Sequence, residues 1–139
     1  MKDPAPPCPC GRTDAKGGLV RYADCCGRWI DTGAPAPDAE ALMRSRYAAF
    51  ARGDERYLLA TWHPGTRPAQ LQLDPAVKWL GLQVRSHRVL DATHAMVEFV
   101  ARSRLHGRAD RLHETSTFAR EPDGRWYYVD GVIQGLAAG

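Results

Sequence analysis

The sequence predicts an α+β domain in which N-terminal helices pack on an antiparallel sheet, preceded by a small metal-binding segment. Two observations predict the domain: apolar residues recur with helical spacing up to residue 63, and from Val77 onward they alternate every second residue. A third observation predicts the segment, since all four cysteines lie within the first 26 residues. Helices that precede a run of strands are typical of the α+β class.

Length and composition set the limits of this fold. The 139 residues suffice for one domain with a small appendage. With 44% hydrophobic residues and a formal net charge of +3, the chain is neither disordered nor as basic as typical nucleic-acid-binding proteins. No apolar run reaches the roughly 20 residues of a membrane span, and the N-terminus lacks the apolar core of a secretion signal. We therefore expect a cytoplasmic protein without a nucleic-acid partner.

The first element is a cysteine-rich segment. Cys8 and Cys10 flank a proline, fourteen residues follow, and Cys25 and Cys26 are adjacent. Two close thiol pairs in a reducing compartment favour a metal site over disulfides. Four thiolates give Zn²⁺ a closed tetrahedral shell with no position for water, so we expect one structural zinc ion. The cations expected to offset the charge of this centre are Arg12, Lys16, Arg21 and Arg28.

A linker and two helices follow. Residues 31–38 are rich in proline and glycine, and we divide the chain into a zinc-binding segment, 1–32, and an α+β domain, 33–139. Asp38 is the expected N-cap of the first helix. Gly53 breaks the helical pattern, and Asp54 caps a second helix that ends before Pro64. Residues 65–76 fit either a loop or a short helix.

Four strands complete the predicted domain. Apolar and polar residues alternate over 80–84, 95–101, 112–118 and 126–130. Short turn signals separate these runs at 91–93, 106–108 and 122–124. Sequential strands with tight connections form an antiparallel meander, and we expect the helices to cover one face of this curved sheet.

Several motifs resemble those of a known family. The CPCG and CCG sequences that contain the cysteines resemble the SEC-C zinc knuckle. MRSRY at 43–47, TWHP at 61–64 and WYYVDG at 126–131 are similar to motifs of the YchJ-like family, UPF0225. The resemblance implies an NTF2-like fold, a cone of helices on a strongly bent antiparallel sheet, and a bound zinc ion.

This sequence departs from the family pattern in two ways. The fourteen residues between the cysteine pairs are more than the usual knuckle has, so we expect a different loop around the same ligands. Many members also carry a second knuckle at the C-terminus, where this sequence reads GLAAG.

An NTF2-like cone can be hollow, so polar residues that point inward form a candidate pocket. The candidates are Arg44, Arg46, Tyr47, Trp62, His63, Glu98, Glu114, Trp126 and Asp130. One hypothesis is proton transfer by His63 with a carboxylate, and another is a non-catalytic ligand pocket. We favour a third, a structural network in which buried arginines pair with carboxylates, and we assign no catalytic residue.

Three functions remain open. The favoured one is a non-catalytic binding module whose knuckle contacts a macromolecular partner, by analogy with the SEC-C element. Side chains between the cysteine pairs would make that contact, among them Arg12, Lys16, Leu19 and Tyr22. The first alternative is an enzyme or small-ligand carrier that uses the cone. The second is a zinc or redox sensor in which oxidation of Cys25 and Cys26 releases the metal.

Overall fold

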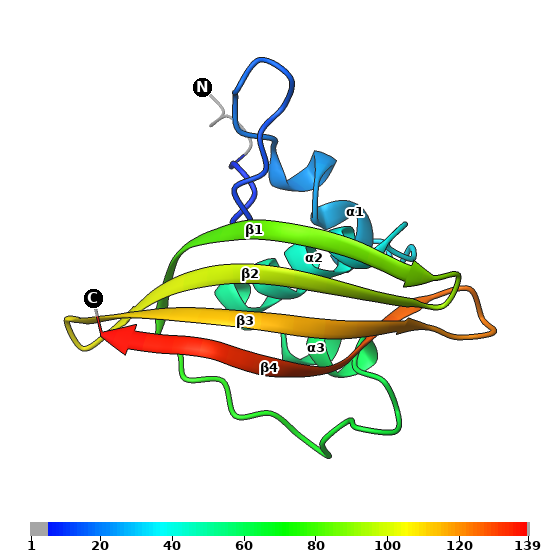
Figure 1. Ribbon diagram of the computed structural model, residues 1–139. Helices are drawn as coiled ribbons and strands as arrows, with labels where there is room; N and C mark the ends of the chain where they lie inside the picture. The colour runs from blue at the N-terminus through cyan, green and yellow to red at the C-terminus, as the bar shows by residue number, and fades with distance from the viewer. Residues whose placement is uncertain (1–5, 139) are drawn as a thin grey trace.

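The computed structural model describes residues 6–138, with side chains up to residue 134, and shows helices on one face of a long curved sheet (Figure 1). In chain order the elements are η1 (Tyr22–Asp24), α1 (Gly27–Ile30), α2 (Ala39–Arg52), α3 (Glu55–Ala60), β1 (Lys78–Asp91), β2 (His94–Leu105), β3 (Arg108–Arg120) and β4 (Trp126–Ala138). The predicted α+β order is confirmed.

The boundaries of the two main helices follow from their caps. The carboxylate of Asp38 accepts a hydrogen bond from the amide of Ala41 at 2.8 Å and begins α2. Gly53 ends α2 with φ 71°, a left-handed conformation that glycine adopts without strain. Asp54 then caps α3 by accepting from the amide of Tyr57 at 3.0 Å. No helix in the described part of the chain is long and apolar enough to cross a membrane.

The sheet is the predicted meander, with strand order β1-β2-β3-β4 and every neighbour antiparallel. The strands are longer than the alternating runs, and β4 extends to Ala138. The central β2–β3 pairing is regular, whereas the pairings of β1 and of β4 both contain register shifts. Residues 65–76 form a loop with turns, so the short helix considered for them is absent.

The core lies between α2 and the sheet face that α2 covers, here called the inner face. Its fully buried side chains include Leu42, Leu58, Val97 and Phe118. The four cysteines and Tyr22 belong to the same buried cluster, so packing is continuous from the cysteine-rich segment into α2. Burial of these apolar groups is the main favourable contribution to the folding free energy.

A β-bulge in β4 changes which face its residues occupy. Phe118 pairs with Tyr128 whereas Thr117 pairs with Asp130, so Val129 is an extra residue. Asp130 therefore leaves the inner face on which Tyr128 lies and is exposed on the outer face. The structure thereby corrects the expectation that Asp130 points inward as part of the candidate pocket.

Candidate metal centre and cone cavity

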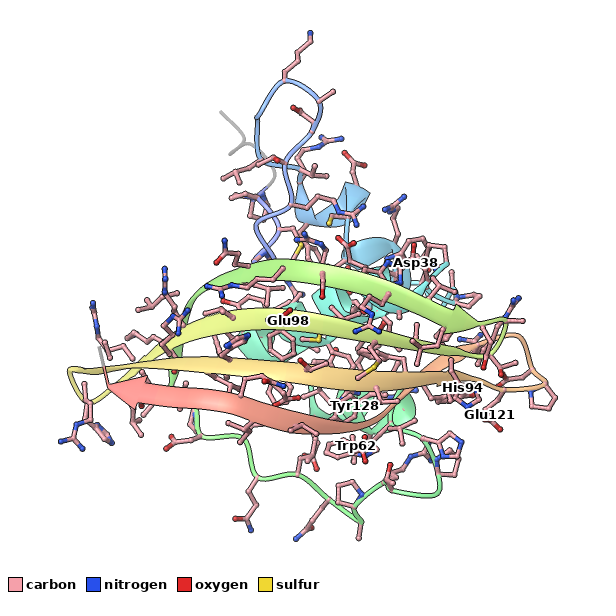
Figure 2. All side chains as sticks on the ribbon, in the orientation of Figure 1. Asp38, Trp62, His94, Glu98, Glu121 and Tyr128 are labelled. Carbon is pink, nitrogen blue, oxygen red and sulfur yellow. The ribbon has the colours of Figure 1, made fainter. Side chains whose placement is uncertain are left out.

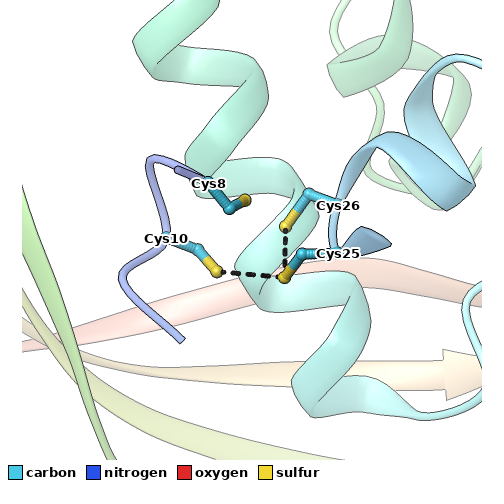
Figure 3. Close-up of side chains that lie close together, drawn as sticks. All are labelled: Cys8, Cys10, Cys25 and Cys26. Atoms are coloured by element: carbon cyan, nitrogen blue, oxygen red, sulfur yellow. Dashed lines mark hydrogen bonds between the residues drawn. The ribbon is translucent and has the colours of Figure 1, made fainter. Parts of the chain in front are cut away.

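The four cysteine sulfurs form one cluster. All four Sγ atoms lie within 4.8 Å of one another, with Cys10 Sγ 3.6 Å from Cys25 Sγ and Cys25 Sγ 4.0 Å from Cys26 Sγ (Figure 3). Four sulfurs at about 2.3 Å from a tetrahedral zinc ion are about 3.8 Å apart, which matches these separations. The cluster therefore has the donor set and spacing of a metal centre that zinc fits.

The local backbone brings the sulfurs together. The amide of Gly11 donates to the carbonyl oxygen of Cys8 at 3.1 Å, which closes a tight turn around the first pair. Cys26 is the N-cap of α1, and Gly27 follows it against Tyr22. A Cβ on Gly27 would lie 2.8 Å from the carbonyl oxygen of Tyr22, so a larger residue would displace backbone. The glycine of the CCG motif thus permits close packing beside the sulfurs.

The long interval between the cysteine pairs forms a protruding hairpin, residues 11–21, which we call the finger (Figure 1). Thr13 and Leu19 form an isolated antiparallel bridge within it. At its tip, the carboxylate of Asp14 accepts from the amides of Lys16 and Gly18 at 2.8 and 3.0 Å. The additional residues therefore project outward and leave the cysteine cluster intact, as expected.

Arg44 of α2 contacts the cysteine cluster. Its Nη1 lies 3.3 Å from the carbonyl oxygen of Cys10 and 3.9 Å from Cys10 Sγ. Glu40 holds the same guanidinium through a 3.0 Å ion pair with Nε. Arg44 was a pocket candidate, but the structure places it at the cysteine cluster, where its positive charge would offset negative charge on the sulfurs.

The four cations that were expected to offset the charge of the thiolates are paired elsewhere or exposed. Arg21 pairs with Asp24 at 2.6 Å, and Arg28 donates to the carbonyl oxygen of Cys25 at 3.1 Å. Arg12 lies 3.8 Å from Glu40, and Lys16 is exposed on the finger. Within residues 6–138, Arg44 is the one arginine or lysine found within hydrogen-bond reach of a cysteine sulfur.

Without metal, the thiols share charge unequally. Hydrogen bonds from Cys26 and Cys8 lower the pKa of Cys10 to about 2. Burial raises the pKa of Cys25 to about 12. Hydrogen bonding to Cys10 also raises the pKa of Cys26. One thiolate is thus stabilised by its protonated neighbours, and a metal ion must displace at least the protons of Cys25 and Cys26.

A second feature is a cavity of about 280 Å³ between α2 and the inner face of the sheet. Four predicted pocket residues line it: Arg46, Tyr47, Trp62 and Glu114. Most of the remaining wall is apolar, and Ser116 and Tyr128 add polar groups. The cone is therefore partly hollow, and the predicted residues Arg46 and Glu114 both line the cavity.

Arg46 is a buried cation with 3% of its surface exposed. Its Nη1 donates to the carbonyl oxygen of Leu58 at 2.8 Å and to Oγ1 of Thr61 at 2.7 Å, which joins α2 to the end of α3. Its guanidinium carbon lies 4.5 Å from the ring centre of Tyr128. Burial lowers the pKa of Arg46 to about 10, so the side chain remains charged at neutral pH.

Glu114 brings a carboxylate to the same cavity. Ser116 donates to its Oε2 at 2.7 Å. The carboxyl group lies against Gly131, where the Cβ of any other residue would overlap it. Among the described residues, no ion pair joins Glu114 to Arg46. The expected pairing of a buried arginine with a carboxylate is thus not formed between Arg46 and Glu114, which have separate partners.

The remaining candidates lie outside the cavity. Glu98 is on the outer face (Figure 2), and its Oε2 lies 2.7 Å from Nε2 of His113. His63 accepts from the amide of Gly65 at 3.0 Å through Nδ1 and lies 3.1 Å from Glu121 through Nε2. Both ring nitrogens of His63 are therefore occupied away from the cavity. Trp126 lines a different groove, and Asp130 is exposed.

The TWHP and WYYVDG motifs, distant in the sequence, contact each other in the fold. Trp62 and Tyr128 form a parallel bridge, and their rings meet edge to face at 5.0 Å (Figure 2). The amide of His63 donates to the carbonyl oxygen of Tyr128 at 2.7 Å. This contact closes the cone where the loop after α3 meets β4. TWHP and WYYVDG thus form one structural unit.

An NTF2-like α+β domain with a buried four-cysteine cluster at its N-terminus defines the class of this protein. The family described as "YchJ, middle NTF2-like domain" matches residues 38–131. A UPF0225 protein of Polaromonas sp. is 61% identical over 131 residues, which cover 92% of this chain and 94% of the relative. A UPF0225 protein of Bordetella pertussis is 56% identical and covers 96% of this chain and 98% of the relative. The chain belongs to the UPF0225 family.

Solved structures agree with this assignment. The solution structure of a SEC-C motif containing protein from Rhodopseudomonas palustris matches with a TM-score of 0.77 and 34% identity, covering 93% of this chain and 99% of that chain. The crystal structure of a SEC-C motif containing protein from Psychrobacter arcticus also has a TM-score of 0.77, at 30% identity, and covers 93% of this chain and 83% of that one. The expected NTF2-like fold and the SEC-C resemblance are confirmed.

Proposed function

We propose that this chain is a non-catalytic cytoplasmic binding protein in which one structural zinc ion fixes the finger, and the finger contacts a protein partner. The observation that carries the proposal is the position of the four thiols at the base of the finger. All four are buried, with exposed fractions of 0 to 5%. A closed thiolate shell has no position for substrate, so the ion's role is to hold the structure.

The burial of the thiols also argues against the sensor alternative. Cysteines that react readily with oxidants are partly exposed and have thiolate character. Cys25 and Cys26 have exposed fractions of only 3% and 1%. A zinc ion bound here is therefore protected from oxidants by the surrounding chain.

The finger offers the surface for a partner. Residues 13–19 are all exposed, and Leu19 has 59% of its surface accessible at the side of the hairpin. Lys16 adds a positive charge near the tip. Tyr22, expected among the contact residues, is buried and donates to Asp31 at 3.0 Å. The proposed contact surface is therefore the finger alone, and Tyr22 is not part of it.

A photo-crosslinking amino acid placed at position 19 tests this function in living cells. Position 89 on β1 is a matched control, because Val89 is 66% exposed and distant from the finger in sequence. We expect position 19 to give a discrete protein adduct that position 89 does not give, and chelation of zinc to remove it. The same adducts from both positions, or none from position 19, would refute the finger as a contact surface.

The affinity for zinc is expected to rise with pH. The pKa values of Cys25 and Cys26 are raised, so both are protonated in the metal-free protein near neutral pH. Acid therefore favours the metal-free form, and displacement of at least these two protons makes the apparent affinity rise by at least about 100-fold per pH unit between pH 6 and 8. Competition with a chromophoric chelator, corrected for its own protonation, measures this slope, and an affinity independent of pH would contradict it.

Replacement of Arg44 by methionine is expected to weaken zinc binding about tenfold while leaving the fold intact. The variant loses a positive charge 3.9 Å from Cys10 Sγ and a donor to the carbonyl oxygen of Cys10. The control is Arg56→Met, which removes an exposed arginine. Chelator competition compares the two variants, and equal zinc affinities would show that the charge of Arg44 is irrelevant.

A further inference from the structure

We propose that the cone cavity binds a small uncharged molecule with an apolar body and a head group that both accepts and donates a hydrogen bond, such as a carboxamide. The head group would lie between Arg46 and Glu114, its carbonyl toward the guanidinium and its N–H toward the carboxylate. This site is separate from the metal centre and the finger, and nothing in the proposed partner contact requires it.

The first argument is that both polar groups are held in place but incompletely paired. Among the described residues, Arg46 has protein acceptors only at Nη1. Glu114 receives one hydrogen bond, from Ser116 to Oε2. The other guanidinium nitrogens and the second carboxylate oxygen therefore remain for a ligand. Polar groups that are held in place and still have unused hydrogen-bonding capacity orient a small ligand in an apolar cavity.

The second argument is charge. Arg46 contributes one positive charge to the cavity and Glu114 one negative charge, so their sum is zero. A carboxylate ligand that pairs with Arg46 would also face Glu114, and an ammonium ligand that pairs with Glu114 would face Arg46. Burial of an ion beside a like charge is costly. A neutral amide satisfies both groups without adding a charge.

The third argument is the remaining wall. Apolar and aromatic side chains cover most of it, among them Phe50, Trp79, Phe99 and Leu112. The volume of about 280 Å³ lies at the small end of ligand pockets and suits a body about the size of one aromatic ring. The wall thus favours a ligand with a small apolar body, and Arg46 and Glu114 favour a head group that accepts and donates a hydrogen bond.

Three probes of one size separate this proposal from non-specific binding: phenylacetamide, phenylacetate and phenethylamine. Each is titrated into the zinc-loaded full chain and followed by amide and indole N–H resonances, since Trp62 and Trp79 line the cavity. We expect phenylacetamide to bind about tenfold more tightly than either charged probe. Absence of cavity shifts with all three probes at millimolar concentration would overturn the proposal.

The variant Glu114→Gln makes the prediction diagnostic. It keeps the size of the side chain but leaves the cavity with the charge of Arg46 alone. The affinity for phenylacetate relative to that for phenylacetamide is therefore expected to rise about tenfold. Glu98→Gln is the matched control, because Glu98 is on the outer face, and it should leave the preference unchanged. An equal change in both variants would refute the role of Glu114.

Two further variants test the proposal independently if Glu114→Gln does not fold. Gly131→Ala places a Cβ where the Glu114 carboxyl group lies, so the flexible carboxyl must move, and phenylacetamide should bind about tenfold more weakly. Ala101→Leu fills part of the cavity wall and is expected to reduce binding of all three probes. Wild-type binding by both variants would place the probes outside the cavity. Crosslinking at position 19 should be unaffected in either case.

Discussion

Replacement of Cys10 by serine is expected to abolish stoichiometric zinc binding and unfold residues 6–32, while the α+β domain stays folded with a lower Tm. Cys10 is fully buried, and its sulfur is 3.6 Å from that of Cys25 and in reach of Arg44. A serine hydroxyl does not replace a thiolate ligand. Binding free energies of order 10 kcal/mol are available from structural zinc, and they stabilise a segment otherwise poor in core residues.

The domain is also affected because the cysteines pack against it. Cys10 and Cys26 share a buried cluster with Leu42 and Met43 of α2, so loss of the segment exposes that side of the helix. Metal analysis and hydrogen exchange measure both effects, with fast exchange expected in 6–32 and retained protection in β2 and β3. Thr13→Ser, an exposed change in the finger, is the control. One zinc per chain in Cys10→Ser with an unchanged melting curve would exclude Cys10 as a ligand.

Replacement of Phe118 by alanine is expected to cost about 3–5 kcal/mol of the free energy of unfolding. Phe118 is fully buried on the inner face, and its ring meets that of Tyr128 at 5.9 Å. The truncation removes apolar contacts and leaves a void that the surrounding strands cannot fill. Urea unfolding followed by tryptophan fluorescence measures the loss, with zinc present throughout.

Val132→Ala is the matched control for Phe118. Val132 lies on β4 and is 65% exposed, so its truncation should change the free energy of unfolding by less than about 0.5 kcal/mol. If the two variants unfold at the same urea concentration, Phe118 does not hold the sheet to the helices.

The order of elements was predictable because its signals are local. Caps at Asp38 and Asp54, the break at Gly53 and the alternation of the strands each depend on residues close in sequence. The lengths of the strands were underestimated, since β4 continues through Gly131 and Gly135, where alternation fades. Pairing with β3 maintains the strand there, and that contact is not visible in the local pattern.

The candidate pocket was only partly predictable. Residues two apart on a helix point about 200° apart, so Arg44 and Arg46 belong on different sides of α2, and the sequence contained that signal. Glu98 has apolar neighbours on both faces of β2, so alternation alone could not show which face is buried. Asp130 was misplaced because a bulge inverts the alternation without a local signal.

The cysteine cluster was the most predictable feature, since two close thiol pairs within 26 residues are a local signal for a metal site. What the sequence could not provide was the cation beside it. Arginines near the cysteines in the chain were the obvious candidates, yet Arg44 lies 34 residues from Cys10. Only the packing of α2 against the segment brings that side chain to the sulfur.

Helix α2 carries a constraint that follows from these contacts. The side chain of Arg44 extends from one side of the helix to Cys10, and the side chain of Arg46 extends from the other side to the cavity. A residue inserted or deleted between Arg44 and Arg46 would rotate one arginine relative to the other by about 100°, and the two could no longer keep their directions. Homologous chains should therefore tolerate length changes in the finger but keep a single residue between the two arginines.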